Sequence, residues 1–276
     1  METEHRRPLR ARDAIRRAEE AIQTEPARRA LRIIESLQGQ FPGEPRLHWL
    51  SARSLERLGR RAEAELEYRR AILGAPEDAD AALDLAELIL EQGRAREAER
   101  LARRVLRRCR DSYRAEGIRA EALRALGHLD AAERALRHAI ELDPDFAWAG
   151  RELSELLCLR GEFREARETL SKLLDRDPLD PYNYGFFGDV LRRTNRPVEA
   201  IEAFRTALFL HPSYAWAARQ LATIQAEQGA LRAVSAPPKG PEVQGAAGPD
   251  PWIYRCLYSI QKRFVGVKDG SVHRDR

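Results

Sequence analysis

The side chains that most often perform catalysis or hold metals are scattered along this 276-residue chain. Its six histidines share no metal-ligand spacing and lie beside no convincing nucleophile; they are His5, His48, His128, His138, His211 and His273. The three cysteines, Cys109, Cys158 and Cys256, form neither a disulfide framework nor a zinc-binding pair. The sequence has no glycine-rich phosphate loop. It therefore predicts a chain that is not an enzyme, with no cofactor and no metal site.

Carboxylates and aromatic rings, by contrast, recur at a fixed interval of 34 residues. One row holds four acids, Glu87, Glu121, Glu155 and Asp189, and a second row holds Trp148, Tyr182 and Trp216. Arginines lie near them in the sequence, among them Arg151, Arg192 and Arg219. At 100° per residue, members of these rows fall on one side of a helix.

Two interpretations of these rows stay open. Rings and carboxylates together suit an extended or helical segment that carries Arg or Lys and apolar anchors, so the ten residues are candidate partner-binding residues. Alternatively, the acids pair with neighbouring arginines and the rings pack on adjacent helices.

The 34-residue interval extends to the residues that build helices. Alanines recur at Ala30, Ala64, Ala98, Ala132, Ala166 and Ala200. A proline follows five of them by twelve residues, and a glycine or asparagine precedes five of them by five residues. A small residue lets two helices approach closely, a glycine ends the first helix, and a proline stops the second. The period thus predicts pairs of antiparallel helices.

This unit resembles the tetratricopeptide repeat, in which Trp, Leu-Gly, Tyr, Gly, Ala, Phe, Ala and Pro occur in that order. The unit at 181–214 matches best, through Tyr184, Phe187, Gly188, Leu191, Ala200, Phe204, Ala207 and Pro212. The resemblance, to arrays of the bacterial type without a fused catalytic domain, implies an all-α, right-handed superhelical solenoid. It also implies that the first helices line a concave groove that binds a partner segment.

The phase places the unit boundaries. An N-terminal extension (1–10) precedes an array at 11–232, whose six units are 11–44, 45–78, 79–112, 113–146, 147–180 and 181–214. A capping helix is expected at 215–229, then a Pro/Gly linker at 233–251 and a short basic amphipathic tail at 252–276.

The tail carries the whole net charge of the chain: residues 1–250 sum to zero and residues 251–276 to +4. Its apolar and aromatic residues include Trp252, Leu257, Ile260 and Phe264. Three readings stay open: it caps the end of the solenoid, it occupies the groove, or it contacts an anionic membrane or a partner, membrane contact being the weakest.

Composition narrows the function classes. No stretch of about 18 apolar residues exists and the first residues are charged, so a cytoplasmic setting is expected. A net charge near zero over the array disfavours nucleic acid, despite the arginine run at 103–110. The sequence predicts a non-catalytic adaptor, scaffold or assembly factor for a protein or peptide partner. The alternatives are a complex- or membrane-tethered subunit acting through its tail and, less favoured, an RNA-associated helical repeat protein.

Overall fold

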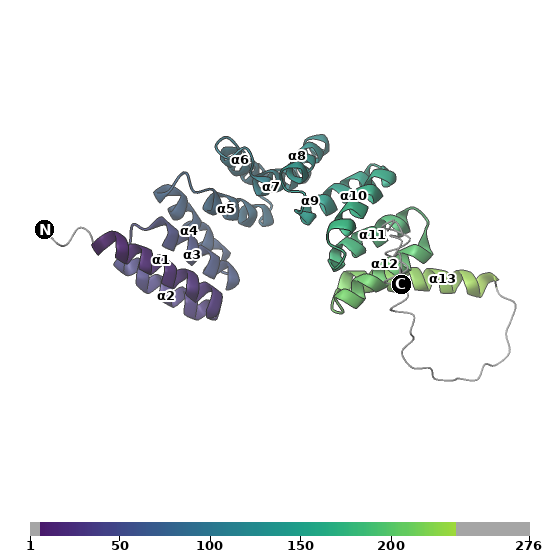
Figure 1. Ribbon diagram of the computed structural model, residues 1–276, viewed down its shortest axis with the longest axis horizontal. Helices are drawn as coiled ribbons and strands as arrows, with labels where there is room; N and C mark the ends of the chain where they lie inside the picture. Colours follow the sequence, from purple (N-terminus) through teal and green to yellow (C-terminus); the bar gives the residue numbers. More distant parts are fainter. Residues whose placement is uncertain (1–5, 236–276) are drawn as a thin grey trace, which may run out of the picture. The chain divides into compact units, whose positions relative to one another are not determined.

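The fold is a series of antiparallel helix pairs. The computed structural model describes residues 6–235, with side chains from residue 11 to residue 227, and these residues form thirteen α-helices and no strand (Figure 1). The predicted all-α repeat fold is confirmed. The helices are α1 (Arg6–Thr24), α2 (Ala27–Gln40), α3 (Pro45–Arg57), α4 (Arg61–Gly74), α5 (Ala79–Glu91), α6 (Ala95–Leu106), α7 (Tyr113–Ala125), α8 (Leu129–Leu142), α9 (Ala147–Leu159), α10 (Phe163–Arg176), α11 (Pro181–Arg193), α12 (Pro197–Leu210) and α13 (Ala215–Ser235).

The helices keep the 34-residue phase. From α3 onward, the first helices of the pairs begin at residues 45, 79, 113, 147, 181 and 215, where the predicted units begin. Between the two helices of a pair, four glycines and Asn195 take left-handed backbone angles, with φ from +57° to +79°. Glycine adopts this conformation without a steric penalty and asparagine with a small one, so the first helix ends there.

The alanine row forms the contact between paired helices. All six alanines, from Ala30 to Ala200, are fully buried. One turn later in five units stands a large residue with at most 2% exposure, and these residues are Ile34, Tyr68, Leu136, Leu170 and Phe204. A small residue beside a large one lets the two helices interdigitate at the density of a protein core.

The residue before each first helix helps to start it. The side chains of Glu44, Asp78, Ser112 and Asp180 accept hydrogen bonds from backbone N–H groups of the first turn. Phe146 holds the same place before α9 and makes no such bond. Tyr214 holds it before α13. Aromatic residues thus replace the usual capping residue at two of the six positions.

Two boundaries differ from the predictions. Helix α1 starts at Arg6, inside the predicted N-terminal extension. Helix α13 continues past Gly229 to Ser235, beyond the predicted ends at 229 and 232, because alanines and a leucine around the glycine outweigh its cost of about 1 kcal/mol. The rest of the predicted linker and the whole tail, including Trp252, Leu257, Ile260 and Phe264, lie outside the described residues.

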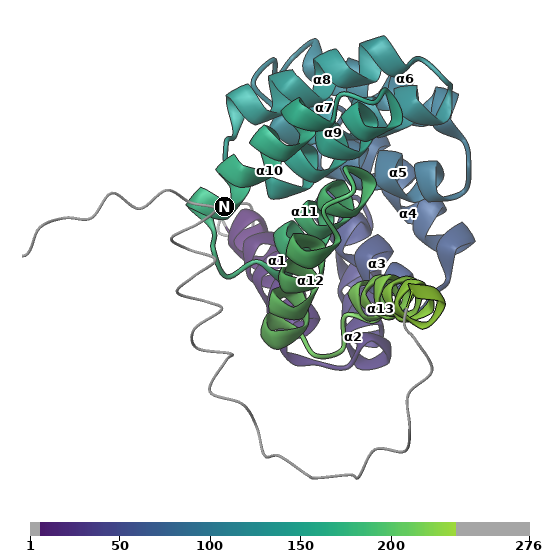
Figure 2. The ribbon, with the colours of Figure 1, turned by 90° about the vertical axis from the view of Figure 1, so that its right-hand side faces the viewer.

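The chain divides into two compact units, an N-terminal unit (Met1–Leu142) and a C-terminal unit (Asp143–Arg276). The N-terminal unit contains α1 to α8 and the C-terminal unit α9 to α13. Within a unit each helix packs on the next, as α11 does on α12 (Figure 2). Successive first helices also touch, α1 with α3 and α5 with α7 in one unit, α9 with α11 in the other. The first helices of each unit therefore form a continuous face.

Candidate functional site

In the N-terminal unit, ion pairs join successive first helices. The second residue of a unit, here called position two, is Arg46 in α3 and Arg114 in α7. Arg46 lies 3.4 Å from Glu19 of α1. Arg114 lies 2.9 Å from Asp84 and 3.1 Å from Glu87, both in α5. Each arginine thus binds acids of the preceding first helix.

A tryptophan completes this network. The indole N–H of Trp49 donates to Asp84 over 2.8 Å, and the guanidinium groups of Arg46 and Arg53 lie 3.8 and 4.8 Å from its ring centroid. Much of the polar surface of the N-terminal face is therefore satisfied from within. Glu121 on α7 is half-buried, and its burial, together with the charges of Glu87 and Glu91, raises its pKa.

In the C-terminal unit, position two is aromatic in every first helix. Trp148 begins α9, Tyr182 begins α11 and Trp216 begins α13. Tyr182 is 43% exposed, and the two tryptophans are half-buried. The structure thus brings the three predicted aromatic residues onto the first helices of one unit.

Further rings extend these three into a cluster. The ring of Tyr214 lies 5.0 Å from that of Tyr182 and 5.8 Å from that of Trp216, centroid to centroid. Trp216 also contacts Phe186 and Phe204, each at 5.9 Å, so its ring is partly structural. His211 lies 6.0 Å from Tyr182, and Phe146 lies 5.4 Å from Trp148.

A glycine provides the space for this cluster. A Cβ atom built on Gly185 of α11 would lie 2.8 Å from Cε1 and 2.9 Å from the hydroxyl oxygen of Tyr214, and 3.2 Å from Trp216. Any larger residue would push the two rings away from the helix. Burial raises the pKa of Tyr214 to about 12. Like any tyrosine, its phenol is neutral at physiological pH and can donate a hydrogen bond.

Arginines of this unit bind either residues outside their own helix, as Arg151 does, or an acid of the same helix, as Arg192 and Arg193 do. Arg151 donates to Asp180 over 2.8 Å and to Asn183 over 2.9 Å, and its guanidinium lies 5.7 Å from the ring of Tyr182. Arg192 and Arg193 both bind Asp189, at 2.8 and 2.6 Å.

Asp189 is only 9% exposed, so it is largely neutralised within its own helix. Glu155 on α9 is half-buried and forms no ion pair with the residues that the structure describes. Arg219 is exposed on α13.

Sequence reasoning missed five members of this site, which are Phe146, Gly185, Phe186, His211 and Tyr214. A signal for two of them was present. Where the residue before a first helix is aromatic instead of a capping residue, at Phe146 and Tyr214, position two is a tryptophan two residues later. The loss of a cap and the gain of a ring coincide.

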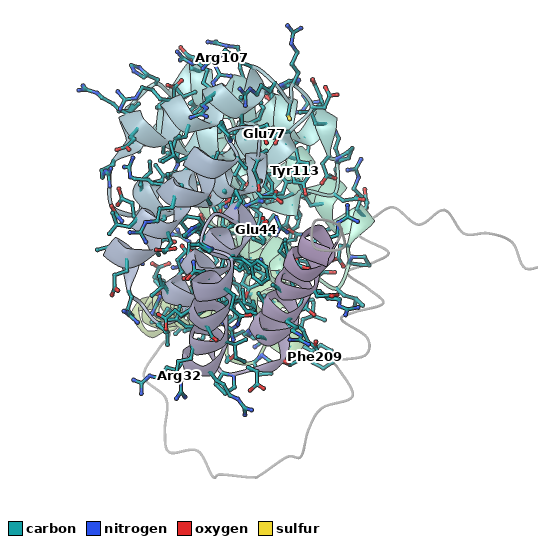
Figure 3. The ribbon with its side chains drawn as sticks, turned by 90° about the vertical axis from the view of Figure 1, so that its left-hand side faces the viewer. Arg32, Glu44, Glu77, Arg107, Tyr113 and Phe209 are labelled. Carbon is teal, nitrogen blue, oxygen red and sulfur yellow. The ribbon has the colours of Figure 1, made fainter. Side chains whose placement is uncertain are left out.

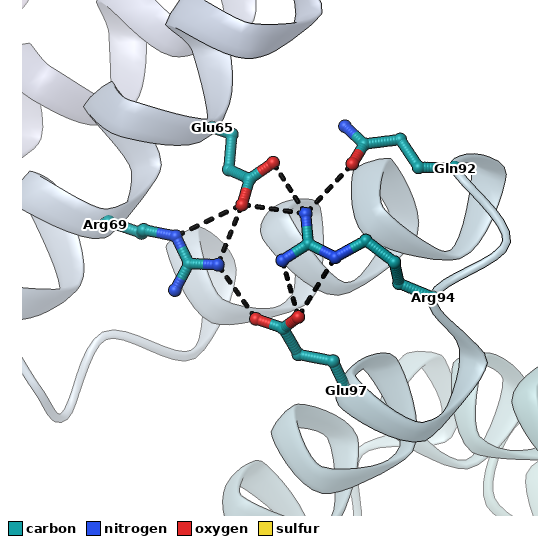
Figure 4. Close-up of polar contacts among 5 residues, drawn as sticks. All are labelled: Glu65, Arg69, Gln92, Arg94 and Glu97. Atoms are coloured by element: carbon teal, nitrogen blue, oxygen red, sulfur yellow. Dashed lines mark hydrogen bonds and ion pairs between the residues drawn. The ribbon is translucent and has the colours of Figure 1, made fainter.

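The second helices carry a different surface, on which arginines and glutamates pair with one another. In Figure 4, Arg69 of α4 and Arg94, just before α6, each contact Glu65 and Glu97, at 2.5 to 2.8 Å. Burial opposes ionisation of Glu65, but these hydrogen bonds keep its pKa below the ordinary value. The network ties α4 to the start of α6.

The arginine run at 103–110 lies near the end of α6. Arg104 and Arg108 donate to the carbonyl oxygen of Pro76, over 3.3 and 2.7 Å, and Arg103 binds Glu99. Arg107 is exposed and projects outward in Figure 3. Several of these arginines therefore serve the packing of their own unit.

The described residues contain neither a metal-binding cluster nor a membrane-spanning helix. Within 6–235, no three or more His, Cys, Asp or Glu side chains are grouped so that they could hold a metal ion. In the same part of the chain, every helix is too short or too polar to cross a membrane.

Comparison with known proteins identifies the family. Two family models described as "Tetratricopeptide repeat" match the chain, one over residues 123–184 and the other over 50–113 and 187–233, which together exceed half of its length. The chain belongs to the tetratricopeptide repeat family. Such repeats bind protein or peptide partners in general and are generally non-catalytic.

One curated relative is "Cellulose synthase operon protein C" of Pseudomonas fluorescens (strain SBW25). The two are 30% identical over an alignment of 128 residues that covers 43% of this chain. The matched part is 10% of that relative's length, so this chain corresponds to a small portion of it.

Solved structures share the fold. A thermophilic TPR protein of Thermus thermophilus has 21% identity and a TM-score of 0.58, over 66% of this chain and 99% of that one. Pseudomonas aeruginosa pilF has 15% identity and a TM-score of 0.67, over 80% and 99%. The APC/C hetero-tetramer Cut9–Hcn1 has 14% identity and a TM-score of 0.68, over 80% of this chain and 43% of the other.

Proposed function

We propose that this tetratricopeptide repeat chain is a non-catalytic scaffold that holds a segment of a partner protein against the first helices of its C-terminal unit. The observation that carries the proposal is the contrast between the two units. Position two holds ion-paired charged residues in α3, α5 and α7, which are Arg46, Asp80 and Arg114, but partly exposed aromatic residues in α9, α11 and α13. One face pairs its charges internally, and the other presents rings.

The capping positions strengthen this argument. Replacing a capping residue by one that cannot cap costs about 1 kcal/mol of helix stability. The chain lacks such a residue at Phe146 and Tyr214, where the ring in its place packs against a tryptophan of the face. These rings enlarge the aromatic surface of the first-helix face, which supports a binding role.

The face suits a particular kind of segment. Aromatic rings supply large contact areas at a low cost in side-chain entropy, and they accept both apolar and cationic groups. The neutral phenol of Tyr214 and the exposed Arg219 add polar contacts at its edge. We propose an extended or helical partner segment with aromatic or aliphatic anchors beside a basic residue. The similarity to the cellulose synthase operon protein leaves the partner open, because it covers a tenth of that protein.

Affinity capture from native lysate tests the proposal. A variant with Trp148→Ala, Tyr182→Ala and Trp216→Ala should lose the proteins that the full chain retains. Because Trp216 also packs on Phe204, a Tyr182→Ala variant tests the face with little risk to folding. Thermal melting followed by circular dichroism verifies that each variant is folded.

A matched control removes apolar surface elsewhere in the same unit. Leu179, Val198 and Phe209 are 69%, 65% and 50% exposed and belong to no first helix. Replacing all three by alanine should leave capture unchanged. Equal capture by the folded aromatic variants and by the full chain would contradict the proposal.

A deletion of residues 252–276 separates this function from one that resides in the tail. Partners retained by both the full chain and the deletion place binding on the repeats. Partners lost with the deletion, while the aromatic variants retain them, would instead assign binding to the tail.

A further inference from the structure

The repeat geometry shows what normally covers a carboxylate on the first-helix face. Glu19 and Glu87 are each bound by an arginine 27 residues later, at position two of the next unit: Arg46 at 3.4 Å and Arg114 at 3.1 Å. In the C-terminal unit, the residue 27 positions after Glu155 of α9 is Tyr182 of α11, and these two helices pack together. A tyrosine therefore takes the place of the arginine.

The other cations near Glu155 are already engaged. Arg151 lies one turn earlier on α9, where it could pair with Glu155, but its guanidinium group donates to Asp180 and Asn183 instead. Arg192 is held by Asp189. Glu155 is thus a half-buried carboxylate whose partner position in the repeat holds a tyrosine, and it forms no ion pair with the described residues.

A carboxylate beside an aromatic ring is a binding position for a guanidinium or ammonium group. The ring attracts the cation through its quadrupole, and the carboxylate supplies a charged hydrogen-bond acceptor. The guanidinium of Arg151 lies 5.7 Å from the ring centroid of Tyr182, yet Tyr182 is still 43% exposed, so part of its ring remains accessible to a second cation.

The chain itself carries a source of cations within reach. Residues 251–276 hold the whole net charge of +4, and their basic residues include Arg255, Lys262 and Arg263. Tyr214, directly before α13, lies 5.0 Å from Tyr182, so α13 starts beside the position and ends roughly 31 Å along its axis, at Ser235. The twenty residues from Ser235 to Arg255 can extend to about 68 Å, so they can cover this distance without being fully stretched.

We propose that Glu155 and Tyr182 hold a basic side chain of this chain's own C-terminal segment, residues 252–276, in the place that Arg46 and Arg114 fill in the N-terminal unit. This deepens the proposed function, because it assigns an occupant to the same face. A tethered segment acts at an effective concentration on the order of millimolar. A partner segment then has to displace it, so the tail sets a threshold for partner affinity.

Site-specific photo-crosslinking of the full chain tests this occupant. The substitution Tyr182→p-benzoylphenylalanine keeps an aromatic ring at the position, and mass spectrometry of the irradiated, purified chain identifies the crosslinked peptides. We expect crosslinks to residues 252–276 in chains that still migrate as monomers, whereas crosslinks found only in dimers would contradict occupancy by the chain's own segment. The same photo-reactive residue in place of Phe209, a 50% exposed ring on α12, is the control position and should give few.

Charge variants then test the chemistry. Glu155→Gln should lower the crosslink yield at position 182 severalfold, as should neutralising Arg255, Lys262 and Arg263 together or raising the salt concentration. Glu168→Gln is the matched control, because Glu168 pairs with Arg164 on the exposed side of α10, and it should leave the yield unchanged. Circular dichroism verifies that the variants are folded.

The proposal is overturned if position 182 gives no crosslinks to residues 252–276, if positions 182 and 209 give them equally, or if folded Glu155→Gln leaves the yield unchanged. Since the experiment contains no partner, its failure is distinct from that of the scaffold function, which capture by the aromatic variants measures separately.

Discussion

The substitution Gly185→Ala tests whether the aromatic cluster rests on the backbone of α11. In a helix, replacing glycine by alanine gains about 1 kcal/mol from backbone entropy. Here the new Cβ atom would lie 2.8 and 2.9 Å from the ring and hydroxyl of Tyr214. Forcing a rigid ring out of a packed site costs about 1–3 kcal/mol. The variant should therefore be destabilised by about 1 kcal/mol.

Gly39 offers the matched control. It lies in α2, where an added Cβ atom meets nothing within 4 Å. Gly39→Ala should stabilise the chain by about 0.5–1 kcal/mol, somewhat less than in a helix centre because Gly39 is next to the last residue of the helix. The two substitutions are chemically identical, so their difference of roughly 1–3 kcal/mol isolates the clash with the rings.

Urea unfolding followed by far-UV circular dichroism measures both variants, and near-UV circular dichroism reports on the rings. Gly185→Ala should unfold at lower urea concentration than the unmodified chain and change the near-UV spectrum, whereas Gly39→Ala should do neither. Equal stabilisation by both substitutions, with an unchanged near-UV spectrum, would refute the argument that the cluster needs a glycine beneath it.

Three further substitutions follow from the described contacts, each measured by urea unfolding. Arg114→Ala removes the cation that Asp84 and Glu87 share and should lower the free energy of unfolding by about 1–2 kcal/mol. Arg164→Ala, in a highly exposed ion pair, should lower it by less than about 0.5 kcal/mol. Equal losses of stability would contradict the argument that Arg114 holds a network. Burial raises the pKa of Glu56, although the hydrogen bond from Tyr68 opposes this rise. Because the folded state disfavours the ionised carboxylate, the folded chain loses stability as the pH rises through that pKa. Glu56→Gln should thus stabilise the chain at pH 7, with a gain that disappears near pH 4, and a pH-independent gain would argue against this cause. Gly161→Ala, at φ +79°, should cost about 1–2 kcal/mol, and a neutral result would show that the loop relaxes freely.

The fold could be predicted from the sequence because its determinants are local and repeat. A turn residue, a buried alanine and a proline define each unit, and the phase places the start of every first helix from residue 45 to residue 215. The end of α13 was harder to predict from the sequence, because a single glycine competes with several good helix formers.

The site was predictable in part, because position in the repeat gives the face of a side chain but leaves its partner undetermined. Glu87 and Asp189 share one position, yet Glu87 binds an arginine of the next unit and Asp189 binds two arginines of its own helix. Which arginine reaches an acid depends on side-chain conformations across helices. The groove assignment of the ten predicted residues therefore stays a prediction.

The constant phase of the first helices has an evolutionary consequence. Since a first helix begins every 34 residues from residue 45 onward, recombination that removes residues 45–78 would join Glu44 to Ala79, and a helix pair would again be followed by a first helix. Whole units can be gained or lost by such events with the fold preserved, because each repeat contacts mainly its neighbours. What changes is the order of ring-bearing and charge-paired units along the chain, so partner preference can diverge in lineages that inherit the same architecture.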